Sequence, residues 1–420
     1  MRTLALLCTP FILAGCIAVN PVTGNKELVM MPLSQQIAMG EQSYGPYQQQ
    51  QGGQYSVDPG LTTYVAAVGK KLAAVSDQPN LPYEFVVLND SSANAWALPG
   101  GKIAVNRGLL SMLDDEAQLA AVLGHEIVHA AAGHAAAQMT RQTFIGLGST
   151  LLGAVAQNSQ YGDLMMMGTQ FGSSALGARY GRDDELVSDK FGVTYMERAG
   201  YDPHGAVELQ EKFLAMKNGN DGDFISNLLA SHPPSSERVG RNTQYAEGKT
   251  GVRNTAAFQK ATAQLRKDKA AYELQAQALK SAENKDYTRA LDLANQAVSK
   301  QPKEALFNIT QGQIHLAKNN MNGAYTAFTQ AAQKNQNYFL PQLLAGVSAK
   351  ALKKTSEAEQ YLTRSLRLLP TPNANYYLGE IALQKGDKNS AKGYFGEAAK
   401  DGGEVGKAAQ AQLANLGVTP

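Results

Sequence analysis

Apolar and polar positions follow different patterns along this chain. Residues 83–106 hold short apolar runs interrupted by turn residues, which predicts a strand at Tyr83–Leu88 and two short strands around Pro99-Gly100-Gly101. Residues 114–138 are rich in alanine and leucine and lack proline, which predicts a helix. Beyond residue 265 the chain repeats a helical pattern. We therefore expect an α+β fold, mostly α, in which a domain with a small sheet precedes an all-α domain.

The repetition in the last third has a fixed length. Small residues recur at steps of 34, 34 and 33 positions, in the series Ala290, Ala324, Ala358 and Ala391. Glycines recur in the same register, at Gly312, Gly346 and Gly379. This pattern resembles the tetratricopeptide repeat, whose paired helices stack into a solenoid with a concave protein-binding surface. We expect four repeats from about Ala270 to Lys400, a capping helix near Gly406–Leu416, and a repeat domain spanning 265–417.

The N-terminus has the pattern of a processing signal. Arg2 precedes a short apolar run, and Leu13-Ala14-Gly15-Cys16 matches a bacterial lipobox. We expect residues 1–15 to be removed, Cys16 to be acylated, and residues 16–55 to form a lipidated tether with a first helix. An ordinary secretory signal or a short membrane anchor is the alternative, although the apolar run is too short to span a bilayer. Ile17 after the cysteine favours the outer membrane, facing the periplasm.

Composition excludes some functions. The net charge of +2 over 420 residues gives no electrostatic reason to expect nucleic acid as a partner. Cys8 lies in the segment expected to be removed and Cys16 is expected to carry lipid, so the mature chain would have no disulfide.

The helix at 114–138 contains the pentapeptide His125-Glu126-Ile127-Val128-His129, an HExxH motif. Because each helical residue turns about 100°, the two histidines lie about 40° apart on one face and can share one Zn²⁺ per chain. Glu126 lies beside that face, where it can act on a water at the metal instead of binding the metal.

A third ligand has to come from elsewhere. Positions 132 and 135 hold alanine, which excludes the longer HExxHxxGxxH motif, and His134 is out of register, so we expect it to pack or to support a ligand. Glu185 and Asp189 lie one helical turn apart downstream. Glu185 can complete a His₂Glu set with one open position, and Asp189 can accept a hydrogen bond from a ligand histidine.

Four segments in order resemble metallopeptidase family 48, the gluzincins of the HtpX and OMA type: NAWALPGGKIAVNRGLL, HEIVHAAAGH, YGRDDELVSDKFG and SHPPSSERV. The resemblance covers about residues 25–245 and implies a zinc metallopeptidase domain at 56–250. It also implies that His232 and Arg238 contact substrate and stabilise the oxyanion, or that His232 plugs the open metal position. Ser188 departs from the alanine usual in the family.

Two further segments have expected roles at the site. The strand containing Asn94, Ala95, Trp96, Ala97 and Leu98 is a candidate edge strand that holds an extended substrate. The apolar, glycine-rich residues 142–157 are expected to form a mobile helix or lid.

Protease, repeats and export together resemble a periplasmic subgroup of the family that degrades stalled outer-membrane proteins and assists their assembly. We therefore expect a periplasmic, lipid-anchored zinc endopeptidase that degrades misfolded envelope proteins, with the repeats docking to the outer-membrane assembly machinery. The alternative is a chaperone or adaptor for outer-membrane protein assembly, in which the zinc site is largely latent.

Overall fold

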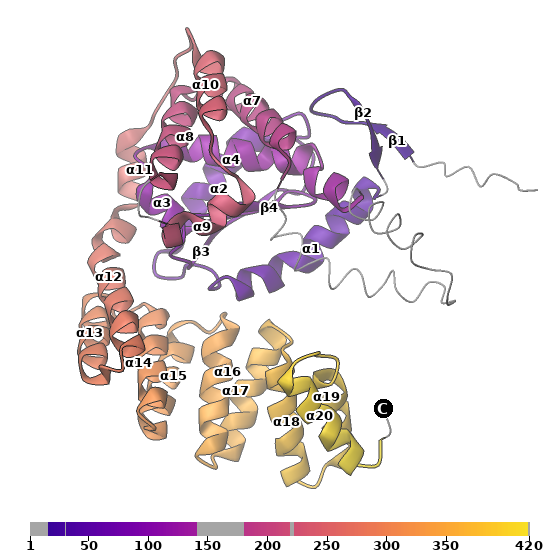
Figure 1. Ribbon diagram of the computed structural model, residues 1–420, viewed down its shortest axis with the longest axis vertical. Helices are drawn as coiled ribbons and strands as arrows, with labels where there is room; N and C mark the ends of the chain where they lie inside the picture. Colours follow the sequence, from indigo (N-terminus) through magenta and orange to yellow (C-terminus); the bar gives the residue numbers. More distant parts are fainter. Residues whose placement is uncertain (1–15, 30, 141–179, 219–221, 419–420) are drawn as a thin grey trace, which may run out of the picture.

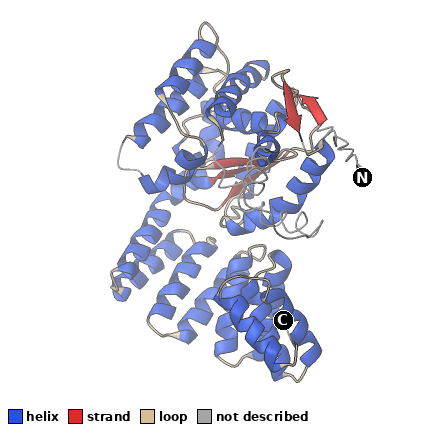
Figure 2. Cartoon of the chain, turned by 45° about the vertical axis from the view of Figure 1, so that its right-hand side comes forward, coloured by secondary structure: helices blue, strands red, loops and turns tan. Residues whose placement is uncertain are grey.

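The computed structural model describes residues 16–29, 31–140, 180–218 and 222–418 (Figure 1). In this part of the chain no helix is both long and apolar enough to cross a membrane. The first two-thirds form a helical body around small sheets, and the last third is entirely helical (Figure 2). The mixed fold class expected from the sequence is confirmed.

The first body contains both strands and helices. The strands are β1 (Cys16–Val19), β2 (Lys26–Val29), β3 (Glu84–Leu88), β4 (Ala95–Leu98) and β5 (Lys102–Asn106). The helices are α1 (Leu33–Gln50), α2 (Pro59–Ala73), α3 (Arg107–Met112), α4 (Glu116–Ala131), α7 (Arg182–Arg198), α8 (His204–Lys217), α9 (Gly222–Ser231), α10 (Ser236–Ala246) and α11 (Thr255–Ala261).

The central sheet has three strands, and β4 lies at one of its edges. Its strand order is β3-β5-β4, with β3 parallel to β5 and β4 antiparallel to β5. Alternate residues face opposite sides of a sheet. Trp96 and Leu98 pack on one side with Tyr44 and Tyr47 of α1, whereas Ala95 belongs to the main core that contains α2 and α4. Helices therefore cover both faces of the sheet.

Residues 16–55 pack against this body, which corrects the prediction of a tether. β1 and β2 pair as an antiparallel hairpin. The side chain of Asn20 after β1 is buried and donates to the carbonyl of Ala132, 3.0 Å away. The hydroxyl of Tyr44 donates to the carbonyl of Ile103 at 2.8 Å, so α1 is fixed directly to the sheet.

The C-terminal third stacks helices in pairs, as a tetratricopeptide solenoid does. Its helices are α12 (Ala263–Glu283), α13 (Tyr287–Lys300), α14 (Ala305–Ala317), α15 (Met321–Lys334), α16 (Phe339–Ala351), α17 (Thr355–Leu368), α18 (Pro372–Gln384), α19 (Lys388–Ala398) and α20 (Glu404–Asn415). A Cβ at Gly312 would lie 2.3 Å from the ring of Phe328, and one at Gly379 would lie 2.7 Å from Phe395. The repeating glycines are thus required by the bulky residue of the partner helix.

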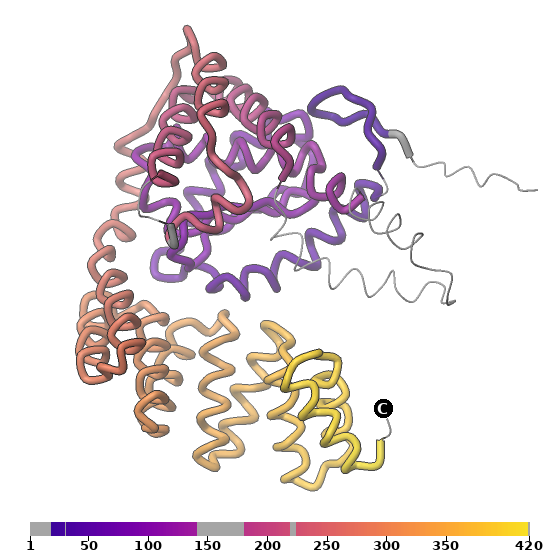
Figure 3. The backbone as a smooth tube through the Cα atoms, in the orientation of Figure 1, coloured from indigo at the N-terminus to yellow at the C-terminus, as the bar shows by residue number. Residues whose placement is uncertain are grey.

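The two parts of the molecule are joined by buried contacts. Phe258 and Leu265 belong to the core of the first body, so the segment between the two expected domains, 56–250 and 265–417, packs against that body. α12 leaves this core and begins the solenoid (Figure 3). Beside it, Asn89 donates to both carboxylate oxygens of Glu304, at 3.1 and 3.2 Å.

Candidate metal centre

The central helix α4 presents both histidines of the motif. Asp115 caps its N-terminus, since Oδ1 accepts a hydrogen bond from the backbone N–H of Gln118 at 3.0 Å. The Nε2 atoms of His125 and His129 lie 3.0 Å apart, as expected for residues one turn apart that face the same ion. The helix is buried almost throughout, so the histidines sit on a rigid element.

Helix α7 supplies Glu185 because two glycines let it approach α4 closely. A Cβ at Gly124 would lie 3.1 Å from the carbonyl oxygen of Gly192. The carboxylate of Glu185 then reaches both histidines, with Oε1 3.3 Å from His129 Nε2 and Oε2 3.4 Å from His125 Nε2.

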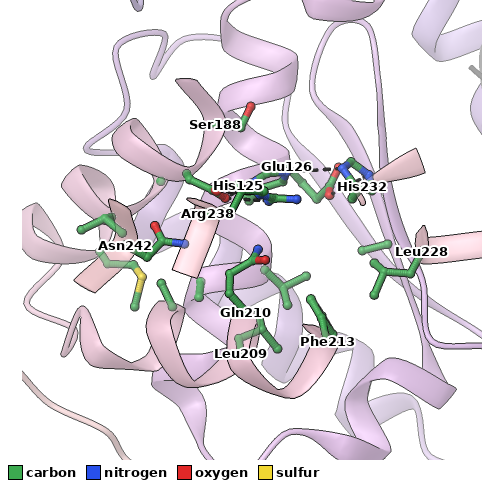
Figure 4. A pocket seen from close by; sticks show the side chains of 18 of the residues that line it. His125, Glu126, Ser188, Leu209, Gln210, Phe213, Leu228, His232, Arg238 and Asn242 are labelled. Atoms are coloured by element: carbon green, nitrogen blue, oxygen red, sulfur yellow. Dashed lines mark hydrogen bonds and ion pairs between the residues drawn. The ribbon is translucent and has the colours of Figure 1, made fainter. Parts of the chain in front are cut away.

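His232, which follows α9, completes the group. Its Nδ1 lies 2.9 Å from Glu185 Oε1 and 3.3 Å from His125 Nε2. One ligand atom from each of the four residues lies within 4.8 Å of the others. The His232 ring points at the same space as Glu126 (Figure 4).

This donor set fits zinc. A tetrahedral zinc site with ligand distances of about 2.1 Å separates neighbouring ligand atoms by about 3.4 Å. The separations given above, from 2.9 to 3.4 Å, are close to that value. Two or three imidazoles with one carboxylate is also a common zinc donor set.

Asp189 and Arg238 lie behind the ligands. Asp189 Oδ1 is 3.1 Å from His125 Nδ1, and this contact orients the His125 ring. Arg238 is buried; its Nε donates to Asp189 Oδ2 at 2.7 Å, and its Nη1 is 2.7 Å from Glu185 Oε2. Burial raises the pKa of the Asp189 carboxyl, but the Arg238 guanidinium outweighs burial and holds that pKa below its usual value.

The position of Arg238 contradicts its predicted role at the oxyanion. Its guanidinium is engaged by two carboxylates and by the carbonyl of Pro233. It therefore holds Glu185 and Asp189 in place. Sequence resemblance located the residue correctly but could not show which way its donors point.

Two aromatic groups support His129 from the other side. His134 Nδ1 lies 2.9 Å from His129 Nδ1, so one ring donates to the other according to their tautomers. Tyr180 stacks on His129 with ring centroids 3.9 Å apart. His134 thus lies beside His129. The stacking of Tyr180 has no signal in the sequence.

Glu126 is placed to act as a base. It is buried beside the ligands, its Oε1 is 3.6 Å from His232 Nε2, and its Oε2 has no hydrogen-bond partner among the described residues. Burial raises the pKa of its carboxyl above the usual value. A carboxylate with a raised pKa and a free oxygen is suited to accept a proton.

The predicted substrate strand lies next to this group only in part. β4 is an edge strand, and Ala95 lines the cavity that contains His125 and Glu126. Trp96 faces α1 instead, where its indole N–H donates to Gln51 at 2.9 Å. The predicted lid at 142–157 lies outside the described residues.

The fold and this site define a zinc metallopeptidase with an HExxH helix and a glutamate ligand from a second helix. The model of Peptidase family M48 matches residues 59–245. The chain is 30% identical over 182 residues to Metalloprotease YcaL of Escherichia coli, an alignment that covers 41% of this chain and 67% of YcaL. The chain belongs to peptidase family M48.

Other relatives match a smaller share of their own length. The Beta-barrel assembly-enhancing protease of Yersinia pestis is 28% identical over 229 residues, covering 52% of this chain and 45% of that protein. The protein of the same name from Escherichia coli is 30% identical over 189 residues, covering 43% and 38%. The chain thus matches less than half the length of these two relatives.

Proposed function

We propose that this protein is a zinc-dependent endopeptidase of the bacterial envelope, anchored by lipid at Cys16, that cleaves misfolded or stalled outer-membrane proteins. The observation that carries the proposal is the convergence of His125, His129 and Glu185 beside Glu126, whose Oε2 has no hydrogen-bond partner among the described residues. The similarity to proteases named for β-barrel assembly supports the part of the proposal that concerns envelope substrates.

The chemistry is amide hydrolysis. When bound, zinc supplies Lewis acidity to the scissile carbonyl and to the attacking water. Glu126 accepts the proton of that water and delivers it to the leaving amine. Asp189 and His134 keep the rings of His125 and His129 oriented. The edge strand β4 aligns the substrate backbone through main-chain hydrogen bonds.

The decisive experiment removes the base and keeps the ligands. Glu126→Gln is expected to retain zinc and to lose cleavage of an unfolded substrate such as casein by several orders of magnitude. The exposed Glu211→Gln on α8 is the matched control and should cleave as the wild type does. Activity of Glu126→Gln within about tenfold of the wild type would assign the base to another group.

His232 has two roles that its position supports. It lies among the ligand atoms, where it can occupy the fourth metal position, and beside Glu126, where it can stabilise the oxyanion. Loss of a stabiliser should slow peptide turnover about a hundredfold, whereas loss of a plug should raise basal and self-cleavage. His232→Ala distinguishes them by both measurements, and unchanged values in both would remove His232 from the site.

The adaptor alternative draws on the same position of His232, because a filled fourth position makes the site latent. In that case the repeats carry the function by docking to the outer-membrane assembly machinery. Glu126→Gln would then still complement a deletion strain, whereas the protease proposal expects no complementation.

The lipid anchor is tested separately. Cys16→Ala is expected to release the protein from the membrane fraction, and a variant that stays with membranes would contradict the anchor.

A further inference from the structure

A cavity extends from the metal centre into the helical body. His125, Glu126 and His232 line one end of it, and its walls are otherwise mainly apolar, formed by Val122, Val193, Met196, Leu209, Phe213 and Leu228. The cavity offers about 40 Å³. Because one water needs about 10–15 Å³ of such space, the cavity suits a few waters or the end of one side chain.

Two amides interrupt these apolar walls. Gln210 of α8 is 6% exposed and Asn242 of α10 is 1% exposed, and both line the cavity. Their amide ends turn toward the space beside Arg238 (Figure 4). Among the described residues, nothing hydrogen-bonds to Gln210 Oε1 or to Asn242 Oδ1. Burying an amide oxygen without a partner destabilises the folded protein, so two such oxygens at one cavity call for an explanation.

We propose that this cavity is the subsite for a substrate side chain beside the scissile bond, and that Gln210 and Asn242 select glutamine or asparagine there. This inference rests on the endopeptidase function proposed above. An amide side chain carries both donors and acceptors, so it can pair with two amides at once. The methylene groups of glutamine would lie against Leu209 and Phe213.

The charges around the cavity disfavour charged substrate side chains. Arg238 directs its donors to Asp189, Glu185 and the carbonyl of Pro233, so it is not available to a substrate carboxylate. A substrate cation would face the buried guanidinium itself. A neutral amide avoids both problems. An aliphatic side chain would leave the two amide oxygens unpaired, which is the basis of discrimination in such sites.

Cleavage of a peptide library tests the preference. The residues on both sides of the scissile bond are varied, and the products of the zinc-loaded protein are sequenced by mass spectrometry. At one of the two positions, we expect peptides with glutamine or asparagine to be cleaved about tenfold or more faster than peptides with leucine or methionine. Gln210→Met, Asn242→Leu and the double variant should lose or reverse this preference. The single variants keep the test valid if the double variant does not fold.

The control is another buried amide of the same chain. Gln342 of α16 is fully buried and its Oε1 also lacks a partner among the described residues, but it lies in the repeats. Gln342→Met should leave the preference unchanged. A wild-type protein that cleaves amide and aliphatic peptides equally, as it would if only buried waters paired the two amides, overturns the proposal. Variants that keep the wild-type preference overturn it too.

Binding without cleavage separates this proposal from the endopeptidase function. Glu126→Gln protein is titrated with two labelled peptides that differ only in glutamine or leucine at the selected position, and fluorescence anisotropy reports affinity. We expect about tenfold weaker binding of the leucine peptide, and equal affinities would refute the subsite. A wild-type protein that cleaves nothing refutes the endopeptidase function, while the binding comparison still decides on the subsite.

Discussion

The metal centre and the repeats hold their shape in opposite ways. At the metal centre, buried charged groups meet from distant parts of the sequence: His125 and His232 are 107 positions apart, and Asp189 and Arg238 are 49 apart. In the repeats, apolar contacts join neighbouring helices, as between Gly312 and Phe328. A centre of few, strong, long-range contacts is expected to fail abruptly when one is removed, whereas nearest-neighbour packing fails by increments.

The largest effect is expected from removal of a ligand. His129→Ala and Glu185→Ala should lose most of the one zinc expected per chain, because each leaves only two of the three strong ligands. His204→Ala is the control, since His204 is exposed and its Nδ1 pairs with Asp202. Metal analysis of the purified proteins decides, and full zinc retention in both ligand variants would refute the ligand assignment.

The next effect concerns the charge behind the ligands. Arg238→Met removes the partner of two buried carboxylates, so it should lower the free energy of unfolding of the metal-free protein by about 3–5 kcal/mol. Arg241→Met, one turn further along α10, breaks an exposed pair with Glu237 and should have a much smaller effect on the free energy of unfolding. Urea unfolding measures both. Equal losses would show that the buried network does not hold the centre together.

A smaller effect is expected in the repeats. Gly312→Ala places a methyl group 2.3 Å from the Phe328 ring and should lower the free energy of unfolding by about 1–3 kcal/mol. Gly393→Ala in α19 meets no atom within 4 Å and should raise it by about 0.5–1 kcal/mol through helix propensity. The two variants should therefore shift thermal unfolding in opposite directions, and a shift of the same sign would mean that the repeat packing is not what fixes the glycine.

The smallest effect concerns the segment between the two parts. Arg253 pairs with Asp115 at 2.7 Å and also contacts Glu208, so Arg253→Gln should cost about 1 kcal/mol or less. The hydrogen bond from Arg253 lowers the pKa of Glu208 below its ordinary 4.5. The contribution of this pair is therefore present above pH 4.5 and is lost as the pH falls through the lowered pKa.

Thermal unfolding of the wild type and Arg253→Gln at pH 7 and pH 3 should show this difference shrinking in acid. Lys249→Gln, which breaks an exposed pair with Glu197, is the comparison. A larger difference in thermal unfolding at pH 3 than at pH 7 would contradict the predicted direction of the pH dependence.

The zinc ligands could be predicted from helical periodicity because they lie on two helices. His125 and His129, and likewise Glu185 and Asp189, are one turn apart, and that spacing can be read directly from the sequence. Arg238 was assigned to the oxyanion because sequence cannot show which carboxylates a guanidinium meets. Tyr180 was missed because ring stacking across the chain leaves no periodic signal.

The N-terminal segment shows how composition can mislead. Residues 16–55 are rich in glutamine, glycine and other polar residues, which is typical of a tether. The buried positions of α1 nevertheless follow helical spacing: Gln36, Gly40, Tyr44, Tyr47 and Gln48. Only two of these five are bulky and apolar, so the sequence shows no apolar stripe that would predict a buried helix face.

The close approach of Gly124 and Gly192 sets how tightly the ion is held. Gly124 adjoins His125, and Gly192 lies about two turns from Glu185 on the same face of α7. A Cβ at Gly192 would lie 3.1 Å from the backbone nitrogen of His125, so one added methyl group would part the two helices by a few tenths of an ångström. Metal affinity is thus open to adjustment, by selection or by engineering, through a backbone spacing that leaves every ligand unchanged.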